Sequence, residues 1–271
     1  MNTDSYFITQ RPHNQFLSTL VDYYFHIDIP VNQLSLEHEF IIPFPRITFG
    51  YFFNHPFLAT NHTLNQSVPV NMAISRISTD NITVQPQSDR VKIIGAHLRP
   101  FCLAYLTKKP IHTMPWLINT VDLFGKKATD FQQRIENCSE AVQMFNEVEK
   151  VLLDNILVRD LYLIINAIEL IEKNAGNIQL RTLSKQLGVS DRTIRNHFYD
   201  HIGCSPKEYI RVVKLKQVAY QMKHSDDTLT CIAYDNDYFD QAHFIHEIRN
   251  VTGKSPNKLR KEIPHFRFLQ F

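Results

Sequence analysis

Glycine is scarce in this sequence, with seven glycines in 271 residues. Phosphate-binding loops need several glycines at fixed spacing, because their backbone must approach the phosphate closely. Neither GxxxxGK[ST] nor GxGxxG occurs, and the GxSxG motif of a nucleophile elbow is also missing. These absences argue against the common nucleotide-binding folds and the α/β-hydrolases, and we expect neither a cofactor nor an enzyme.

Clustered cysteines and long apolar runs are also lacking. The four cysteines show no CxxC spacing, so we expect thiols in a reducing cytoplasm rather than metal ligands or disulfides. No run has the length of a membrane span, and the first residues lack the pattern of a signal peptide. The six histidines between positions 26 and 112 form no His-x-His or i, i+4 pair, so we expect no metal site there.

The first 115 residues favour strands. They hold ten of the thirteen prolines, and between the prolines lie short runs rich in Val, Ile, Phe and Tyr. This pattern predicts an all-β sheet or a small barrel, whose aromatic residues could line a cavity for a small ligand. The expected strands are Leu20–Ile29, Phe40–Phe53 with a break at its two prolines, Asn71–Ile77, Ile82–Gln85 and Val91–Leu98.

Helical periodicity begins after these strands. Phe101–Lys108 predicts a short helix, and Ala128 to about Asn155 predicts one amphipathic helix. A further helix is expected over Leu161–Lys173, ending at Gly176. The apolar stripe after residue 125 would suit a homodimer. The fold class that we expect is α+β, with a β-rich N-terminal part and an all-α C-terminal part.

The last third of the chain contains one pattern twice. In each copy, apolar residues stand four and eight positions after a residue that favours helix N-caps. The first matching residue of each copy, Leu183 or Ile232, is 49 residues from its counterpart, whereas the later matching residues are 50 apart. The turn of the second copy is therefore one residue longer. Each copy therefore predicts helix, tight turn, helix. The matching residues are Leu183, Ser190, Ile194, Phe198, Gly203, Ser205 and Pro206 in the first copy, and Ile232, Asp240, Phe244, Ile248, Gly253, Ser255 and Pro256 in the second.

Such a unit presents its second helix outward, where it fits the major groove of B-DNA. A long helix over Pro206–Met222 would hold the two units at a fixed separation. Arg and Gln can each make two hydrogen bonds to a purine edge, and Ala can contact a thymine methyl group. The DNA-contacting residues that we predict are Ser190, Arg192, Thr193, Arg195, Asn196, Tyr199 and Lys207 with the first unit, and Gln241, Ala242, His243, His246, Arg249 and Lys254 with the second.

These motifs resemble the AraC/XylS-type transcription regulators over about 85 residues. The resemblance lies in Ser-x-Arg-Thr at the first recognition helix, Gly-x-Ser-Pro after each unit, Asp-Gln-x-His-Phe at the second, and an Arg-x-x-x-Leu-x-x-x-Ala linker that starts at Arg211. It implies two helix-turn-helix subdomains in successive major grooves, and transcription control at promoters with RNA polymerase as a partner. Asn196 and His246 stand where the family usually has Arg. Asp237 stands where it usually has Gly, so we expect a left-handed backbone conformation there, which Asp tolerates better than most residues.

A looser resemblance covers residues 93–125, where a strand ends in Arg-Pro and a short helix precedes Leu-Phe-Gly. It implies a divergent cupin-like sensory domain that takes a small-molecule effector. We therefore expect a β-rich sensory domain at 1–125, a helical dimerisation or linker segment at 126–176 and a DNA-binding domain at 177–264.

Charge separates the two halves of the chain. Residues 177–271 carry 15 Lys and Arg against 10 Asp and Glu, a net charge of +5, whereas residues 1–176 carry 14 against 17, a net charge of −3. Only the C-terminal part has the basic excess that contacts to DNA phosphates need. Two alternatives remain open. One is a DNA-processing enzyme with Cys102 as its nucleophile, and the other is a protein-interaction module with weakened DNA contacts.

Overall fold

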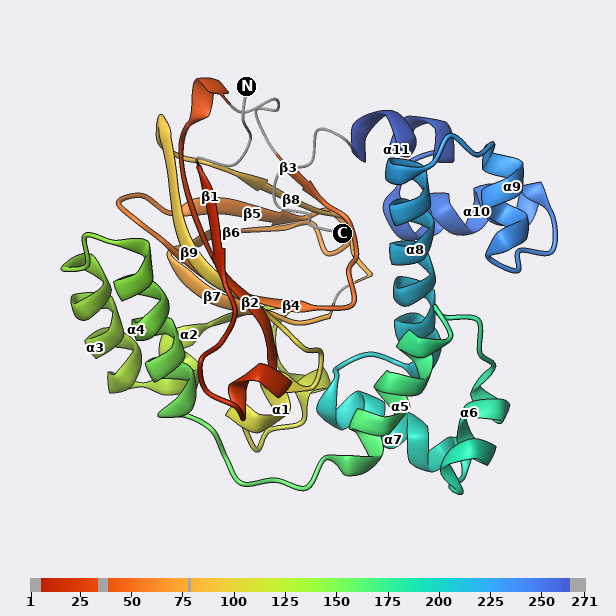
Figure 1. Ribbon diagram of the computed structural model, residues 1–271, viewed down its shortest axis with the longest axis horizontal. Coiled ribbons are helices and arrows are strands. Elements are labelled where there is room, and N and C mark those ends of the chain that lie inside the picture. Colours follow the sequence, from red (N-terminus) through yellow and green to blue (C-terminus); the bar gives the residue numbers. More distant parts are fainter. Residues whose placement is uncertain (1–5, 34–38, 78, 264–271) are drawn as a thin grey trace.

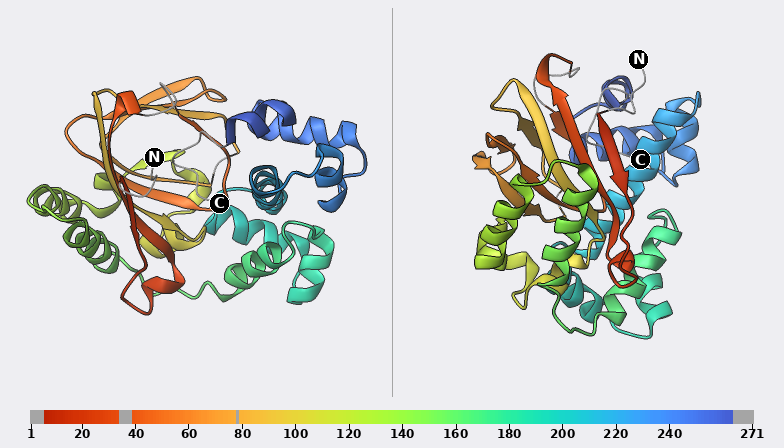
Figure 2. Two further views of the ribbon diagram at one scale, coloured as in Figure 1. Left: turned by 45° about the horizontal axis from the view of Figure 1, so that its top comes forward. Right: turned by 60° about the vertical axis from the view of Figure 1, so that its left-hand side comes forward.

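The N-terminal half consists of two antiparallel sheets that face each other. The computed structural model describes residues 6–33, 39–77 and 79–263. One sheet has the strand order β1-β2-β9-β4-β7-β10 and the other the order β3-β8-β5-β6. Figures 1 and 2 show the two sheets beside the helical C-terminal half. The strands are β1 (Phe7–Gln10), β2 (Val21–Pro30), β3 (Glu39–Ile41), β4 (Ile47–Phe52), β5 (Phe57–Asn61), β6 (Gln66–Val70), β7 (Met72–Ser75), β8 (Ile82–Gln85), β9 (Arg90–Leu98) and β10 (Leu117–Asn119).

The centre of the larger sheet depends on a glycine. Gly95 of β9 lies opposite Phe25 of β2 and Gly50 of β4 in the strand register. A Cβ atom on Gly95 would lie 2.4 Å from the Phe49 carbonyl oxygen and 2.5 Å from the Phe25 ring. No side chain fits there, so this glycine allows β2, β4 and β9 to pack under the Phe25 ring.

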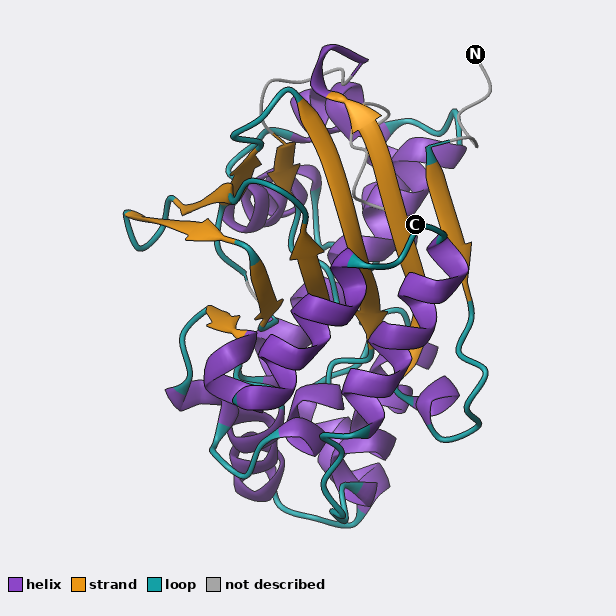
Figure 3. Ribbon diagram, turned by 90° about the vertical axis from the view of Figure 1, so that its left-hand side faces the viewer, coloured by secondary structure: helices purple, strands orange, loops and turns teal. Residues whose placement is uncertain are grey.

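Two helices, α3 (Lys126–Glu136) and α4 (Ala141–Leu153), cover the outer face of the larger sheet, while α2 (Thr120–Phe124) contacts β7 and β10 and α1 (Cys102–Leu106) lies below the sheets in Figure 1. Figure 3 shows helices in front of the strands. Phe131 of α3 packs against Phe49, with ring centroids 5.7 Å apart, and Phe145 of α4 stacks on Tyr24 at 6.2 Å. The prediction of one helix from Ala128 to about Asn155 is wrong, because the chain turns at residues 137–140 and a capping box starts α4.

The C-terminal half is all helical, so the expected fold class is confirmed. Helix α5 (Tyr162–Lys173) leads into α6 (Leu180–Leu187) and α7 (Asp191–His201), which form the first unit. The long helix α8 (Pro206–His224) runs from there to α9 (Leu229–Asp235) and α10 (Gln241–Thr252), which form the second unit, and α11 (Pro256–Glu262) follows (Figure 1). No helix in the described part of the chain is both long and apolar enough to cross a membrane.

The two units belong to different cores. The first unit shares one continuous apolar core with the larger sheet and α1 to α5, through Leu183, Ile194 and Phe198. The second unit has a separate core around Phe244 and Ile248, which the end of α8 completes. The N-terminal half contributes two buried side chains to that second core, Phe40 and Ile42.

Candidate nucleic-acid interface

Both recognition helices, α7 and α10, begin as the sequence predicts. The Ser190 hydroxyl accepts a hydrogen bond from the Thr193 backbone N–H at 3.1 Å. The Asp240 carboxylate accepts one from the His243 backbone N–H at 2.7 Å. These caps satisfy N–H groups that have no partner within the helix, so each recognition helix has a defined first turn.

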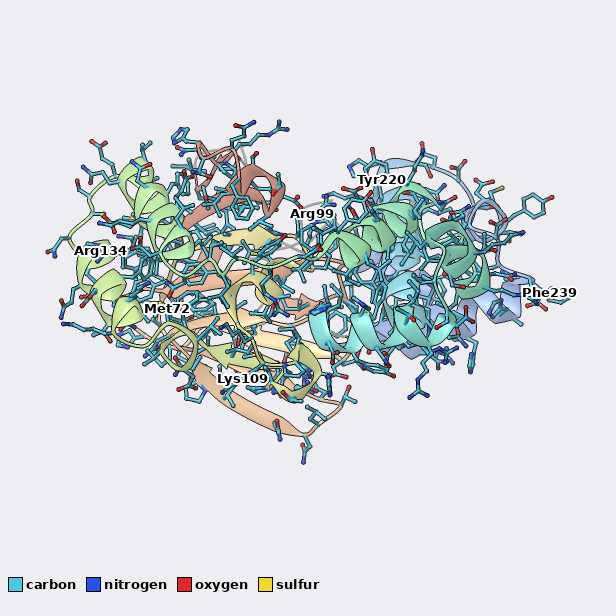
Figure 4. The ribbon with its side chains drawn as sticks, turned by 90° about the horizontal axis from the view of Figure 1, so that it is seen from below. Met72, Arg99, Lys109, Arg134, Tyr220 and Phe239 are labelled. Atoms are coloured by element: carbon cyan, nitrogen blue, oxygen red, sulfur yellow. The ribbon has the colours of Figure 1, made fainter. Side chains whose placement is uncertain are left out.

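The additional residue of the second turn is Phe239. The Val189 N–H donates to the Ser184 carbonyl, and the Tyr238 N–H donates to the Ala233 carbonyl, both at 3.1 Å. The residues of these two equivalent bonds are 49 apart in the sequence, whereas the N-cap residues that follow, Ser190 and Asp240, are 50 apart. The extra residue therefore lies directly before Asp240. Asp237 adopts the expected left-handed conformation, with φ of 52°, and Gly188 at the corresponding position of the first turn has φ of 67°, so the two turns share this feature. Phe239 is 91% exposed and points away from the protein at its outer edge (Figure 4).

Most of the predicted DNA contacts lie on exposed surface. Four of them line one groove of about 940 Å³ along α8: Arg195 and Tyr199 of α7, Lys207 of the first turn of α8, and His243 of α10. The structure therefore brings parts of both predicted surfaces together. Other exposed residues are Ser190, Arg192, Asn196, Gln241, Ala242, His246 and Arg249, while Thr193 is half-buried.

Several predicted residues have partners within the protein, among them Lys254 and His246. Lys254 forms an ion pair with Glu262, and its ammonium lies 4.2 Å from the centroid of the Phe40 ring. In this arrangement it is turned toward the N-terminal half rather than toward DNA. The His246 ring lies 3.0 Å from the Asn250 side-chain amide, on the same helix face.

Sequence reasoning missed the basic side chains that α8 adds to the groove. Arg211 pairs with Glu247 of α10 at 2.8 Å, and the Lys214 ammonium lies 5.0 Å from the centroid of the Tyr238 ring. Both contacts join the linker helix to the second unit. Arg211 and Lys214 are three residues apart, so they lie on the same face of the predicted helix. This spacing could have indicated that both side chains face the groove.

The C-terminal end of α7 is covered by a short 3₁₀ helix, η3 (Ile111–Thr113), from the N-terminal half. The His112 Nδ1 lies 3.2 Å from the Tyr199 carbonyl oxygen and 3.7 Å from the Asp200 carboxylate. A Cβ atom on Gly203 would lie 2.8 Å from Ile111 Cγ2. The first recognition helix therefore ends against the sheet region.

A half-buried carboxylate, that of Glu172, joins the same two parts. Glu172 of α5 accepts hydrogen bonds from the Arg46 guanidinium at 2.5 Å and from the Tyr209 hydroxyl at 2.8 Å. Arg99 lies 3.5 Å from the other oxygen of Glu172, and Figure 4 places Arg99 at the junction of the halves. Although burial opposes its charge, Arg46 has a raised pKa, because Glu172 and Asp22 both stabilise the guanidinium.

A cavity of about 200 Å³ lies between the two sheets. Its wall is mainly apolar, as the aromatic residues of the first strands predict. His97 is one of its polar residues, and burial lowers the pKa of this imidazole to about 4. The other polar wall residues include Arg46, Arg76 and Asp80, and the apolar ones include Phe25, Phe44, Phe52, Phe57, Ile93 and Trp116.

The structure disfavours the enzyme alternative. Cys102 is fully buried in the core, and burial raises the pKa of its thiol to about 12. A catalytic thiol needs access to substrate and a lowered pKa. Within the described ranges, no group of three or more His, Cys, Asp or Glu side chains could hold a metal ion.

Comparison with known proteins adds family information for the C-terminal half. A helix-turn-helix domain family matches residues 183–262. HTH-type transcriptional activator RhaS of Escherichia fergusonii is 28% identical over 87 residues, which are 32% of this chain and 31% of that protein. An uncharacterised HTH-type transcriptional regulator of Haemophilus influenzae is 26% identical over 96 residues, 35% of this chain and 32% of that protein. The matched part thus spans about a third of these relatives.

Solved structures extend the likeness of the fold to the whole chain. ToxT from Vibrio cholerae superimposes with a TM-score of 0.52 at 10% identity, over 96% of this chain and 99% of that one. A second ToxT structure holds (E)-4-(8-methylnaphthalen-1-yl)but-3-enoic acid and has a TM-score of 0.52 at 10% identity, over 95% and 99% of the two chains. The sheet pair followed by a double helix-turn-helix region is therefore an arrangement that another protein shares.

Proposed function

We propose that this chain is a sequence-specific DNA-binding transcription regulator of the AraC/XylS type, because residues 183–262 match a helix-turn-helix domain family and resemble HTH-type transcriptional activators. The main support is the pair of capped, exposed recognition helices that α8 holds beside one basic groove. Such helices enter successive major grooves on one face of the duplex, roughly 34 Å apart. We expect two half-sites at that spacing in each promoter that the protein binds.

The proposed base contacts come from the first exposed turns of each helix. Arg192, Arg195 and Asn196 contact base edges in one groove. Phosphates are contacted by the helix N-termini and by Lys185 and Lys207. Lys254 contacts a phosphate after its ion pair with Glu262 breaks. In the next groove the contacts come from Gln241, Ala242, His243 and His246.

The first test is the DNA preference of the Arg195→Ala variant. Genomic fragments recovered with the purified full chain define the preferred sequence. Arg195→Ala should relax the preference at one base pair, at a cost of about 1–3 kcal/mol. Arg181→Ala is the matched control, because Arg181 is equally exposed but lies on α6. An unchanged preferred sequence for Arg195→Ala would contradict the role of α7.

Salt dependence separates this function from the protein-interaction module. DNA binding through several phosphate contacts releases counterions, so its affinity falls steeply as salt rises. A gel shift of the full chain at two salt concentrations measures this fall. A chain that shifts no recovered fragment at low salt would favour the protein-interaction module instead.

We also propose that a small effector binds the cavity between the sheets. The support is an apolar wall with a few polar groups, which is typical of ligand sites. We assign the sensory role to residues 1–125, the linker role to 126–176 and DNA binding to 177–264. A ligand that raises the melting temperature of the full chain, and fails to do so when Ala59 is replaced by Phe in the cavity wall, would identify the site.

RNA polymerase is the protein partner that we propose. The second turn carries the exposed side chains of Tyr234, Asp235, Asp237 and Phe239. An acidic and aromatic surface repels DNA phosphates, but it fits a basic protein surface beside the promoter. Transcription in vitro from a recovered fragment, with and without the protein, measures this role.

A homodimer through α3 and α4 is proposed as well, and sedimentation of the full chain tests it.

A further inference from the structure

The groove between the two units carries more positive than negative charge. Its described lining residues all lie between Gly176 and Val251, so they come from the two units and α8. In Figure 1 the sheets lie on one side of α8, and α9 and α10 lie on the other. An excess of positive charge suits a polyanion such as the DNA backbone. Basic side chains outnumber carboxylates in the lining, with Arg195, Lys207, Arg211 and Lys214 against Asp237 and Glu247.

The two cations that α8 places in the middle of this groove differ in their partners. Arg211 is neutralised, because its Nε donates to the Glu247 carboxylate at 2.8 Å. The Lys214 ammonium lies over the Tyr238 ring instead, 5.0 Å from the ring centroid. Within the described ranges, no carboxylate lies within ion-pair distance of Lys214. Of the two cations, Lys214 is therefore the one that can take an anionic partner without breaking an ion pair.

The surroundings of Lys214 disfavour its charge while no anion is bound. Burial lowers the pKa of this ammonium, whereas the carboxylates of Asp237 and Glu247 act in the opposite direction. The face of the Tyr238 ring offers only the weak attraction of a quadrupole, whereas a phosphate offers a full negative charge. A phosphate that comes within reach should therefore replace the ring as the partner of Lys214.

The stem of Lys214 is held where the two units meet. The turn before α6 is pressed against α8, because a Cβ atom on Gly176 would lie 2.8 Å from the Lys214 backbone nitrogen and 3.0 Å from the Lys214 Cβ atom. On the other side, Tyr238 belongs to the turn of the second unit and packs edge to face on Phe244, with ring centroids 5.0 Å apart. Lys214 thus lies between the units rather than on either recognition helix.

This central position corresponds to the part of the duplex between the two half-sites. Successive major grooves on one face of B-DNA are about one helical turn apart, and a minor groove lies between them on that face. The two backbone strands that border this minor groove therefore face α8 when both recognition helices are in place. A lysine carries a compact charge on a flexible stem, so it can reach a phosphate there without a fixed geometry.

We infer that, when DNA binds, the Lys214 ammonium leaves the Tyr238 ring and contacts a backbone phosphate between the two half-sites. This inference rests on the proposed function and adds a contact that lies outside both recognition helices. Phosphate contacts fix the register of a protein on the duplex and carry no base information. Lys214 should therefore contribute to affinity and leave the preferred sequence unchanged.

Lys216 provides a matched control, because it lies two residues further along the same helix and faces the other way. Its ammonium also lies over an aromatic ring, that of Phe44 in the N-terminal half, 5.2 Å from the ring centroid. Both lysines are half-buried, but only Lys214 is among the described groove residues. Lys216→Gln therefore removes the same charge and the same kind of contact from the side of α8 that faces the sheets.

The first experiment measures how the affinity of full-length Lys214→Gln for a recovered DNA fragment depends on salt. One phosphate contact contributes about 0.9 to the slope of log affinity against log salt, so the loss of affinity should be roughly eightfold greater at 0.1 M than at 1 M salt. Lys214→Arg keeps the charge and should keep the slope, and Lys216→Gln should match the wild type. An unchanged slope for Lys214→Gln, or an equal fall for Lys216→Gln, would overturn the inference.

The second experiment changes the DNA, so it holds even if a variant fails to fold. Methylphosphonates remove the charge of single phosphates across the recovered site. In the wild type, at least one replacement between the half-sites should weaken binding several-fold. Lys214→Gln should be insensitive to that replacement, whereas Lys216→Gln should respond as the wild type does. A wild type that tolerates every central replacement, or a Lys214 that couples only to a phosphate within a half-site, would refute the central contact.

The wild-type chain keeps this inference separate from the proposed function. A wild type that binds no recovered fragment refutes the proposed function, and the inference falls with it. A wild type that binds two half-sites, together with an unchanged salt slope for Lys214→Gln, refutes the inference alone. Binding-site selection with Lys214→Gln should return the wild-type sequence, and an altered preference would mean that Lys214 contacts bases or positions a recognition helix instead.

Discussion

The two helix-turn-helix units are copies in sequence, yet they differ in what surrounds them. Both have a capped recognition helix and an apolar pair four residues apart, Ile194 with Phe198 and Phe244 with Ile248. The first unit is continuous with the core of the larger sheet, whereas the second packs on the end of α8. Local sequence therefore determines the fold of each helix-turn-helix unit. The surrounding core determines which other part of the protein unfolds together with that unit.

The same difference appears in charge and contact. Two ordered contacts connect the first unit and its flanking helices to the N-terminal half: the Glu172 cluster and η3. The second unit is connected by the packing of Phe40 and Ile42 and by Lys254. Control by the N-terminal half is thus expected to act first on α7. Two pairs of substitutions and one change of pH test this asymmetry.

The largest effect is expected for Phe198→Ala and Phe244→Ala. Both side chains are fully buried, so each substitution should lower the free energy of unfolding of its own core by about 3–5 kcal/mol. Phe198→Ala should destabilise the sheets together with the first unit. Phe244→Ala should destabilise mainly residues 225–263, because that core is separate. Urea unfolding followed by hydrogen exchange measures both outcomes.

A single transition that moves equally for both variants would contradict two separate cores. The pair is well matched, since the residues hold equivalent positions in the repeat and the same side chain is removed. Any difference in where protection is lost therefore reports the neighbours of each unit rather than the substitution.

Features set by nearby residues were predictable from the sequence. The caps, the left-handed Asp237, the long α8 and the strands β2, β8 and β9 follow from local patterns, and the structure confirms them. Strands β1, β5, β6 and β10 were missed. Strand β6 contains Pro69 and is largely exposed, so its place comes from pairing with β5 rather than from its own composition.

The break between α3 and α4 had a local signal that the apolar periodicity concealed. Glu140 and Gln143 form a capping box, a spacing that marks a helix start. The junction of the two halves had no such signal. Arg46 and Glu172 are 126 residues apart, and His112 and Tyr199 are 87 apart, so their meeting depends on the complete fold. The partner of Lys254 was missed for another reason: Glu262 is only eight residues away, but the turn after Gly253 brings the two side chains together.

Lowering the pH should destabilise the core of the first unit more than that of the second, by less than the phenylalanine substitutions do. His97 keeps a pKa of about 4 in the folded protein against about 6.5 when unfolded, so the unfolded chain takes up the proton first. Its contribution is fully present above pH 6.5 and is lost as the pH falls toward 4, by up to roughly 3 kcal/mol. Urea midpoints of the sheets and first unit should fall between pH 7 and 5, while the hydrogen-exchange protection factors of residues 241–252 stay constant. His97→Gln should flatten the dependence, and a variant as acid-sensitive as the wild type would refute its origin in His97.

The smallest of the three effects is expected for the two carboxylates that connect helices, Glu172 and Glu247. Glu172→Gln removes the charge that Arg46 and Tyr209 share, but Asp22 still neutralises Arg46, so the loss should be about 1.5–3 kcal/mol rather than the full cost of an isolated buried charge. Glu247→Gln breaks a more exposed pair with Arg211 and should cost at most about 1 kcal/mol. High salt should shrink the second loss and leave the first, because a buried pair is poorly screened. Equal losses that salt weakens equally would mean that Glu172 is an ordinary surface pair and that the first unit is no more firmly held than the second.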